Sequence, residues 1–240
     1  MPQTTQIPSS TPYAWPHDST LSPTTTALLI IDMQHDFLSS SGYLATLSPS
    51  TGNRFTPLIP TISHLLTAFR RASFPVIHTR EGHEASLATV SSRELHRSRV
   101  SGAQIGAPGP LGRFLIRGEK GHDIIPELAP LRDEVVIDKP GRGAFANTEL
   151  EAVLRAKGVR NLVVCGVTAD ACVSTTVREA SDRGYDVLVV ADGVESINDE
   201  LKKWSLEAFK VEGGLFGVTA ESEAVLDAVA SWYPGRSDGK

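Results

Sequence analysis

Short apolar runs alternate with longer amphipathic segments along most of this chain. The apolar runs cover residues 26–32, 74–79, 134–138, 161–165 and 185–192. Short, nearly continuous apolar runs are typical of strands that are buried on both faces of a parallel sheet.

Segments with helical spacing of apolar residues follow or precede these runs. They cover residues 61–72, 148–157, about 171–183 and about 199–211. The alternation predicts an α/β fold, a three-layer Rossmann-like arrangement with a mainly parallel sheet flanked by helices on both faces. In such a fold the ligand site lies outside the carboxyl ends of the strands.

The segments outside this alternation divide the chain further. Residues 1–26 are rich in Ser, Thr and Pro and predict an extended arm, in which Tyr13 and Trp15 pack against the domain or a neighbouring subunit. Residues 27–233 are expected to form one domain, followed by a polar tail over 234–240.

A glycine-rich, irregular stretch over residues 81–126 interrupts the pattern. So long a loop predicts the wall or lid of a binding site. It contains a basic cluster of Arg93, Arg97 and Arg99, which we interpret as a solvated helix face or a local subunit contact.

Composition excludes several classes of function. With 240 residues and a net charge of −5, the chain has no overall attraction for nucleic acid or an anionic membrane. No apolar run approaches the roughly 20 residues that cross a bilayer. Its two cysteines, Cys165 and Cys172, lie too close together for a disulfide framework, so a reducing, cytoplasmic setting is expected.

Three reactive side chains stand at or just after the ends of predicted strands. Cys172 lies near the start of a predicted helix, where the helix dipole is expected to lower a thiol pKa, whereas Cys165 lies within an apolar run. Asp32 is the candidate base for this thiol, and Lys139 is the cation beside both. Taken singly, each has an ordinary structural explanation: a turn aspartate, an exposed lysine and a small buried cysteine.

Three ordered segments carry a resemblance to a known family. Residues 27–37, 137–145 and 165–173 resemble the opening, lysine and cysteine motifs of the isochorismatase-like cysteine hydrolases. The resemblance extends from about residue 23 to about residue 218, nearly the whole predicted domain.

That resemblance implies specific roles. It implies a catalytic triad of Asp32, Lys139 and Cys172. It also implies a cis peptide bond before Thr168 and an oxyanion hole formed by the backbone N–H groups of Thr168 and Cys172.

Within the family, the chain looks most like the biuret hydrolase and ureidoacrylate amidohydrolase branch. Residues 78–83, 118–128 and 138–141 carry this likeness. It implies a homo-oligomer, a tetramer by analogy with the family, acting on a small molecule without a cofactor.

Four residues are candidates for the substrate wall: Phe37, Arg80, Arg142 and Glu212. Phe37 is suited to stack on a flat ureide, and Arg80 to bind a carbonyl or carboxylate through paired N–H groups. Core packing for Phe37 and a structural ion pair for Arg80 remain the alternatives. Glu212 occupies a place where biuret hydrolases carry a glutamine, so it is expected to influence specificity.

Glu81 and two histidines are candidates for a metal site. Glu81 and His83 stand where nicotinamidases of the family have an Asp-x-His metal pair, and His96 follows as a potential third ligand. Because the biuret-like branch has the same Glu-Gly-His without a metal requirement, we predict no metal.

The sequence therefore predicts a hydrolase of carbon–nitrogen bonds in linear amides, acting on a small ureide or amide through a thioester. Three alternatives stay open: a metal-containing nicotinamidase, an isochorismatase that needs no thiol nucleophile, and a non-catalytic binding protein on the same fold.

Overall fold

Six parallel strands form the central sheet of the computed structural model, which describes residues 3–51 and 53–235. Their order is β5-β2-β1-β6-β7-β8. They span Thr26–Ile31 (β1), Val76–Glu81 (β2), Val135–Lys139 (β5), Asn161–Val167 (β6), Asp186–Glu195 (β7) and Val218–Ala220 (β8). A small hairpin of Pro108–Gly109 (β3) and Gly112–Arg113 (β4) lies apart from this sheet.

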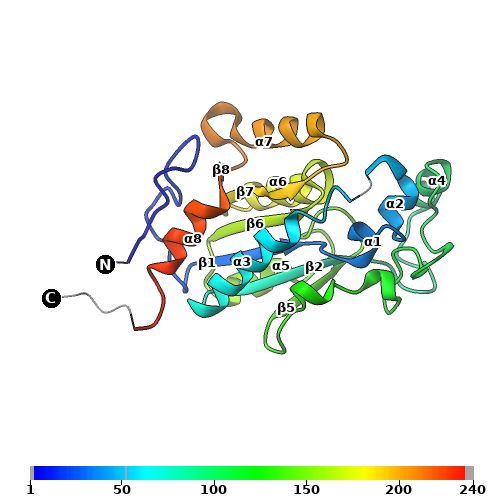
Figure 1. Cartoon of the computed structure of the whole chain (residues 1–240), viewed down its shortest axis with the longest axis horizontal. Coiled ribbons are helices and arrows are strands. Elements are labelled where there is room, and N and C mark those ends of the chain that lie inside the picture. Colours follow the sequence, from blue (N-terminus) through cyan, green and yellow to red (C-terminus); the bar gives the residue numbers. More distant parts are fainter. Residues whose placement is uncertain (1–2, 52, 236–240) are drawn as a thin grey trace.

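Helices cover both faces of the sheet (Figure 1). They are His35–Leu38 (α1), Tyr43–Leu47 (α2), Leu58–Arg71 (α3), Ser92–Val100 (α4), Leu150–Ala156 (α5), Ser174–Asp182 (α6), Asp199–Gly214 (α7) and Ser222–Ala230 (α8). Single-turn 3-10 helices occur at Pro49–Thr51, Lys120–His122 and Pro126–Leu128. The three-layer α/β prediction is confirmed.

Alternate residues of each strand pack into different cores. On β1, Leu28 and Ile30 lie in the core with α3 and α8, whereas Leu29 and Ile31 lie in the core with α5, α6 and α7. Because both faces are covered, all six residues of β1 are buried. This explains why the predicted strands are continuous apolar runs instead of alternating ones.

The C-terminal part differs from the sequence prediction. The pattern did not indicate β8, which has only three residues, or α8 after it. The helix expected from about residue 171 begins instead with a π turn over Ala169–Val173, and α6 follows directly.

The N-terminal arm packs on its own domain. Ile7 and Trp15 are almost completely buried, and Thr11 pairs with Thr219 of β8. The Tyr13 hydroxyl donates a hydrogen bond of 2.7 Å to Asp186. The arm is therefore held against the edge of the sheet through both apolar and polar contacts.

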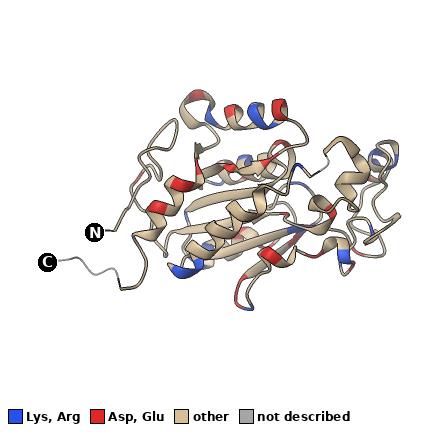
Figure 2. Ribbon diagram, viewed as in Figure 1, with Lys and Arg blue, Asp and Glu red and all other residues tan. Residues whose placement is uncertain are grey.

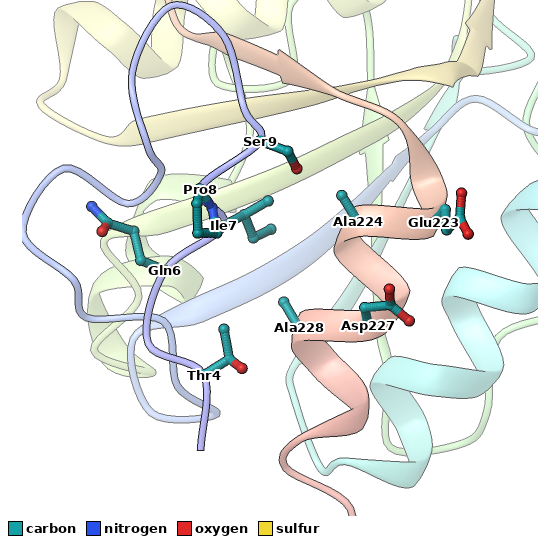
Figure 3. Close-up of a pocket in the computed structure, with 9 residues that line it drawn as sticks. All are labelled: Thr4, Gln6, Ile7, Pro8, Ser9, Glu223, Ala224, Asp227 and Ala228. Atoms are coloured by element: carbon teal, nitrogen blue, oxygen red, sulfur yellow. The ribbon is translucent and has the colours of Figure 1, made fainter. Parts of the chain in front are cut away.

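A groove separates the arm from α8 (Figure 3). It measures about 360 Å³, and Glu223 and Asp227 of α8 line one side. Figure 2 shows that the charged residues of α8 are all acidic, whereas acidic and basic residues are interleaved along α7. The groove lies at the opposite end of the molecule from α1, α2 and α4 (Figure 1).

Within residues 3–51 and 53–235, no helix combines the length and apolar character needed to span a bilayer. Most of the predicted polar tail, residues 236–240, lies outside the described residues.

Candidate active site

The candidate site lies where the strand order changes direction. β1 pairs with β2 on one side and with β6 on the other, so the chain segments leaving β1 and β6 diverge at their carboxyl ends. Close approach of the two strands depends on Gly166 of β6, since a Cβ there would lie 2.1 Å from the carbonyl oxygen of Ile31. The backbone of Gly166 also has a φ of +116°, which few other residues adopt.

Asp32 follows β1 in an unusual backbone conformation. Its φ of 51° turns the residue out of the strand direction. The Thr79 hydroxyl donates a hydrogen bond of 2.6 Å to Asp32 Oδ1, and the Asp32 N–H donates one of 3.2 Å to the same hydroxyl oxygen. Thr79 of β2 thereby fixes the carboxylate, which is completely buried.

Lys139 ends β5 with a fully buried ammonium. Its Nζ lies 2.8 Å from Asp32 Oδ2 and 3.5 Å from Glu81 Oε2, and it donates 2.7 Å to the Gly141 carbonyl. Burial alone lowers an ammonium pKa, but the negative charges around Nζ raise the pKa of Lys139 above its ordinary value. Lys139 is therefore charged at neutral pH.

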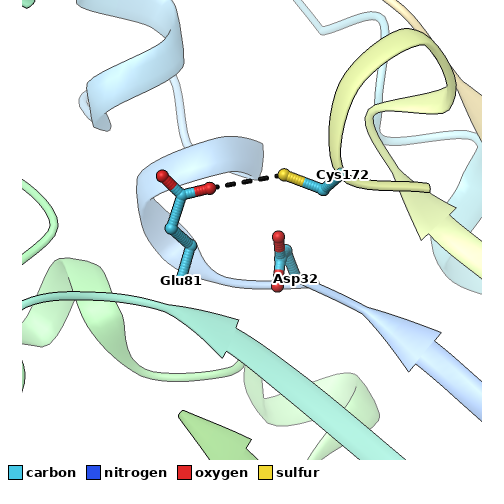
Figure 4. A group of neighbouring side chains, drawn as sticks. All are labelled: Asp32, Glu81 and Cys172. Atoms are coloured by element: carbon cyan, nitrogen blue, oxygen red, sulfur yellow. Dashed lines mark hydrogen bonds between the residues drawn. The ribbon is translucent and has the colours of Figure 1, made fainter. Parts of the chain in front are cut away.

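Cys172 and Glu81 complete the cluster (Figure 4). The Cys172 thiol donates to Glu81 Oε2 at 3.3 Å. The thiol and the carboxylates of Asp32 and Glu81 have oxygen or sulfur atoms within 4.8 Å of one another. The structure thus brings Asp32, Lys139 and Cys172 together and adds Glu81, a member that the sequence considered only as a metal ligand.

Glu81 is held in place by a side chain that the sequence analysis did not single out. Gln34, in the loop after β1, accepts a hydrogen bond of 2.7 Å from the Glu81 N–H. Its side-chain amide also donates a hydrogen bond of 3.1 Å to the Glu81 carbonyl oxygen. Burial favours protonation of Glu81, but Lys139 and Arg142 lower its pKa below the ordinary value. Glu81 is therefore the ionised acceptor for the thiol. The sequence signal for it was its place at the end of a strand.

The expectation of a lowered pKa for the Cys172 thiol is wrong. Burial, with the nearby charges of Asp32 and Glu81, raises the pKa of the Cys172 thiol well above its ordinary value despite the Lys139 ammonium. Cys172 does lie near a helix start, as predicted, because its π turn leads directly into α6. The resting nucleophile is accordingly a neutral thiol whose proton must be removed during attack.

This state predicts the pH dependence of alkylation. A neutral thiol with a raised pKa gains reactivity as pH rises past about 8.5, the ordinary value for cysteine. We expect the second-order rate of iodoacetamide alkylation at Cys172, followed by peptide mass spectrometry, to increase continuously from pH 6 to 10. Fast alkylation that is independent of pH between 6 and 8 would instead reveal a preformed thiolate.

The metal ligands considered in the sequence do not converge. His83 Nδ1 lies 3.2 Å from the Thr89 hydroxyl, His96 is exposed on α4, and Glu81 contacts Lys139. The Asp32, Glu81 and Cys172 cluster already surrounds the Lys139 ammonium, which would repel a second cation. This donor set therefore fits a buried ion-pair network better than a metal centre.

A pocket of about 220 Å³ opens onto Cys172. Phe37, Arg142 and Thr168 line it, as do Tyr43, Leu44, Leu47, Glu81, Arg97, Asp170, Ala171 and Ile197. The Val167–Thr168 peptide bond is cis, as the resemblance implied. Thr168 and Cys172, the two residues expected to supply the oxyanion hole, thus share one wall of the cavity.

Two predicted wall residues lie elsewhere. Arg80 forms a paired ion contact with Asp138, at 2.7 and 3.0 Å, on the neighbouring strand. Glu212 is exposed at a kink in α7, with a φ of 51°. Neither lines the pocket around Cys172.

The interpretation of Arg97 as part of a solvated face is wrong. Arg97 lines the pocket and donates to Glu94 Oε1, whereas Arg93 and Arg99 on the same helix are exposed. Residues 81–126 thus contribute a pocket wall through α4, as the irregular stretch predicted.

The part of the chain that carries these strand-end side chains matches a known protein family. A family model described as the isochorismatase domain matches residues 26–223. The chain belongs to the isochorismatase family. All four members of the buried cluster, Asp32, Glu81, Lys139 and Cys172, lie within the matched isochorismatase domain.

Individual relatives agree with this membership. The chain is 27% identical over 225 residues to the ureidoacrylate amidohydrolase RutB of Serratia proteamaculans, covering 91% of this chain and 88% of the relative. It is 32% identical over 169 residues to RutB of Acinetobacter baylyi, covering 69% of each. Among solved structures, a cysteine hydrolase from Pseudomonas syringae pv. phaseolicola superimposes with a TM-score of 0.75 at 26% identity, covering 89% of this chain and 96% of that one.

Proposed function

We propose that this protein is a cysteine-dependent amidohydrolase that cleaves a C–N bond of a small linear amide or ureide through a thioester. The observation that carries the proposal is the buried Cys172 thiol, which donates to a carboxylate 3.3 Å away and opens onto a pocket of substrate size. Similarity to two ureidoacrylate amidohydrolases supports the same reaction class.

In the first half-reaction, the Cys172 sulfur attacks the substrate carbonyl carbon. Its proton, which is directed to Glu81 in the resting enzyme, passes to Asp32, whose carboxylate lies within 4.8 Å of the sulfur. The backbone N–H groups of Thr168 and Cys172 bind the developing oxyanion. Collapse of the tetrahedral intermediate breaks the C–N bond. Asp32 gives its proton to the departing nitrogen, which leaves as ammonia or an amine and leaves an acyl or carbamoyl thioester on Cys172.

In the second half-reaction, water attacks the thioester while Asp32 accepts a proton from it. The C–S bond breaks, the product acid is released, and the proton returns to the thiol. Burial raises the pKa of Asp32 even though Lys139 favours its ionised form. A carboxyl group with a raised pKa suits both proton acceptance and proton donation near neutral pH.

Glu81 and Lys139 act on the same groups through charge. Glu81 orients the thiol by accepting its hydrogen bond, and Lys139 stabilises Asp32 and the transient thiolate. Phe37 and Arg142, which line the pocket, are the proposed substrate-wall residues.

The test is ammonia release from a panel of biuret, triuret, ureidoacrylate, nicotinamide and simple carboxamides, each assayed with and without EDTA. We expect release from a linear ureide or amide that is unchanged by the chelator. Release from nicotinamide alone, abolished by EDTA, would favour a metal-containing nicotinamidase. Silence across the panel would reopen the isochorismatase and non-catalytic alternatives.

A further inference from the structure

We propose that Glu81 is a further catalytic residue, which in the acyl-enzyme accepts a hydrogen bond from the water that hydrolyses the thioester on Cys172. This inference rests on the proposed function and deepens it, because it gives the second half-reaction a group that holds the attacking water. It depends on the place of Glu81 beside the sulfur and on the loss of its thiol donor when the thioester forms (Figure 4).

Two buried carboxylates flank the thiol, but they face different surroundings. They reach the sulfur from different segments, Glu81 from the end of β2 and Asp32 from the end of β1 (Figure 4). Glu81 lines the pocket, whereas Asp32 is completely buried and, among the residues that the structure describes, is not part of the pocket wall. Water that enters from the pocket therefore meets Glu81 before it meets Asp32.

Thioester formation takes a donor away from Glu81. In the free enzyme, Oε2 accepts from the thiol at 3.3 Å and from Lys139 Nζ at 3.5 Å. Within the described part of the chain, no group donates a hydrogen bond to Oε1. The sulfur of a thioester carries no hydrogen, so acylation leaves this buried carboxylate with Lys139 alone. A new donor is then favourable, and the departing nitrogen vacates a polar space of the kind in which water binds.

A water on Glu81 Oε2 is placed for attack on the thioester. The thioester carbon is bonded to the Cys172 sulfur, which lies 3.3 Å from Oε2, and a hydrogen-bonded water lies about 2.8 Å from its acceptor. The water is therefore held beside the carbonyl carbon. Its oxygen forms the new C–O bond, one of its protons passes to Asp32, and the C–S bond breaks as that proton returns to the sulfur.

The charged neighbours divide the work between the two carboxylates. Burial raises the pKa of Asp32, which suits a group that takes up a proton. Burial also favours protonation of Glu81, but Lys139 and Arg142 outweigh it and hold the pKa of Glu81 below its ordinary value. Glu81 thus stays ionised and holds the water. Because Gln34 bonds to both the N–H and the carbonyl of Glu81, this acceptor is in place before substrate binds.

The experiment replaces Glu81 with glutamine, which keeps the shape but not the charge, and with methionine, which keeps neither the charge nor an oxygen acceptor. The substrate is whichever of biuret, triuret, ureidoacrylate and the simple carboxamides the wild type cleaves fastest. Rapid quenching follows the released nitrogen product, and peptide mass spectrometry follows Cys172. That product leaves in the first half-reaction, so slow thioester hydrolysis gives an initial burst and an accumulation of acylated Cys172.

We expect kcat to fall about 10-fold in Glu81→Gln and about 100-fold in Glu81→Met, as for loss of a hydrogen bond to a charged group. The ratio kcat/KM should fall less, because it includes only the steps up to release of the first product. Hydroxylamine, a stronger nucleophile than water, should restore turnover by attacking the accumulated thioester. Both variants should show the burst and the adduct.

Glu134→Gln is the control for loss of a buried carboxylate. The Glu134 side chain is 9% exposed and pairs with Arg70 at 2.7 Å, and it does not line the pocket around Cys172. Its burst and its level of acylated Cys172 should match those of the wild type. In the Glu81 variants, iodoacetamide should alkylate Cys172 faster at pH 8 than in the wild type, because one of the charges that raise the thiol pKa is gone.

Equal losses in kcat and kcat/KM, with no burst and no extra acylated Cys172, would overturn the proposal, since Glu81 would then act only on the thiol or on the fold. An unchanged kcat in both variants would overturn it as well. Failure of the proposed function has a different signature. Wild-type turnover that survives Cys172→Ala would remove the thioester itself, whatever the Glu81 variants do.

Discussion

Replacing Cys172 with alanine should reduce turnover by about 10³-fold or more, since loss of a covalent nucleophile removes the whole thioester route. The free energy of unfolding should change by no more than about 1 kcal/mol, because the thiol lies at the pocket wall and Glu81 Oε2, which loses the thiol as donor, keeps its contact with Lys139 Nζ. Ammonia release and urea unfolding measure the two quantities separately.

Cys165 provides the matched control. It is fully buried within β6, away from the pocket, and burial raises its thiol pKa, so it serves packing. Cys165→Ala should cost roughly 1 kcal/mol of stability and keep kcat/KM within about 2-fold. If Cys172→Ala remained active, or if Cys165→Ala alone abolished turnover, the assignment of the nucleophile would be wrong.

Lys139→Met should abolish turnover and destabilise the fold by about 3–5 kcal/mol. Methionine fills a similar volume but leaves the buried carboxylates of Asp32 and Glu81 without their cation. Without that cation the folded-state pKa of Asp32, which burial already raises, rises further, and the pKa of Glu81 rises from below to above its unfolded value. Such groups favour folding below the unfolded pKa and oppose it as pH rises, so the deficit against wild type should be smaller at pH 5 than at pH 8.

Urea unfolding of both proteins at the two pH values checks this sign. Lys210→Met is the surface control, because Lys210 pairs with the exposed Glu207 at 2.8 Å and should contribute less than about 1 kcal/mol. A Lys139→Met deficit that is equal at pH 5 and pH 8 would show that the loss comes from packing and not from unpaired charge.

The layered fold and the meeting of Asp32, Lys139 and Cys172 could be predicted from the sequence. The fold follows from continuous apolar strands. The meeting of the three side chains follows from carboxyl ends that share one edge, together with the resemblance of three ordered motifs to the isochorismatase-like cysteine hydrolases. Local spacing did not reveal β8 because three residues give no periodicity.

The residues of the substrate wall were harder to predict from the sequence, because they depend on the direction in which each side chain points. Arg80 and Glu81 are neighbours on β2, and adjacent strand residues point to opposite faces. Arg80 therefore meets Asp138 on β5, while Glu81 reaches the thiol. Likewise, the placement of Arg97 against the pocket depends on how α4 packs, which its charge pattern does not specify.

The prediction of a lowered pKa for the Cys172 thiol was wrong for a related reason. Proximity to a helix start was visible in the sequence, but complete burial beside two carboxylates was not, and these effects outweigh the cation. The homotetramer and the cytoplasmic setting stay predictions.

Trapping the intermediate on Cys172 tests the central claim most directly. Wild type is mixed with the best ureide of the panel, quenched in acid and analysed by intact and peptide mass spectrometry, with a parallel reaction in hydroxylamine. We predict an acyl or carbamoyl mass on the Cys172 peptide, or its capture as a hydroxamate or hydroxyurea, and neither with Cys172→Ala. Efficient turnover by wild type with no adduct on Cys172 and no captured product would contradict a thioester mechanism.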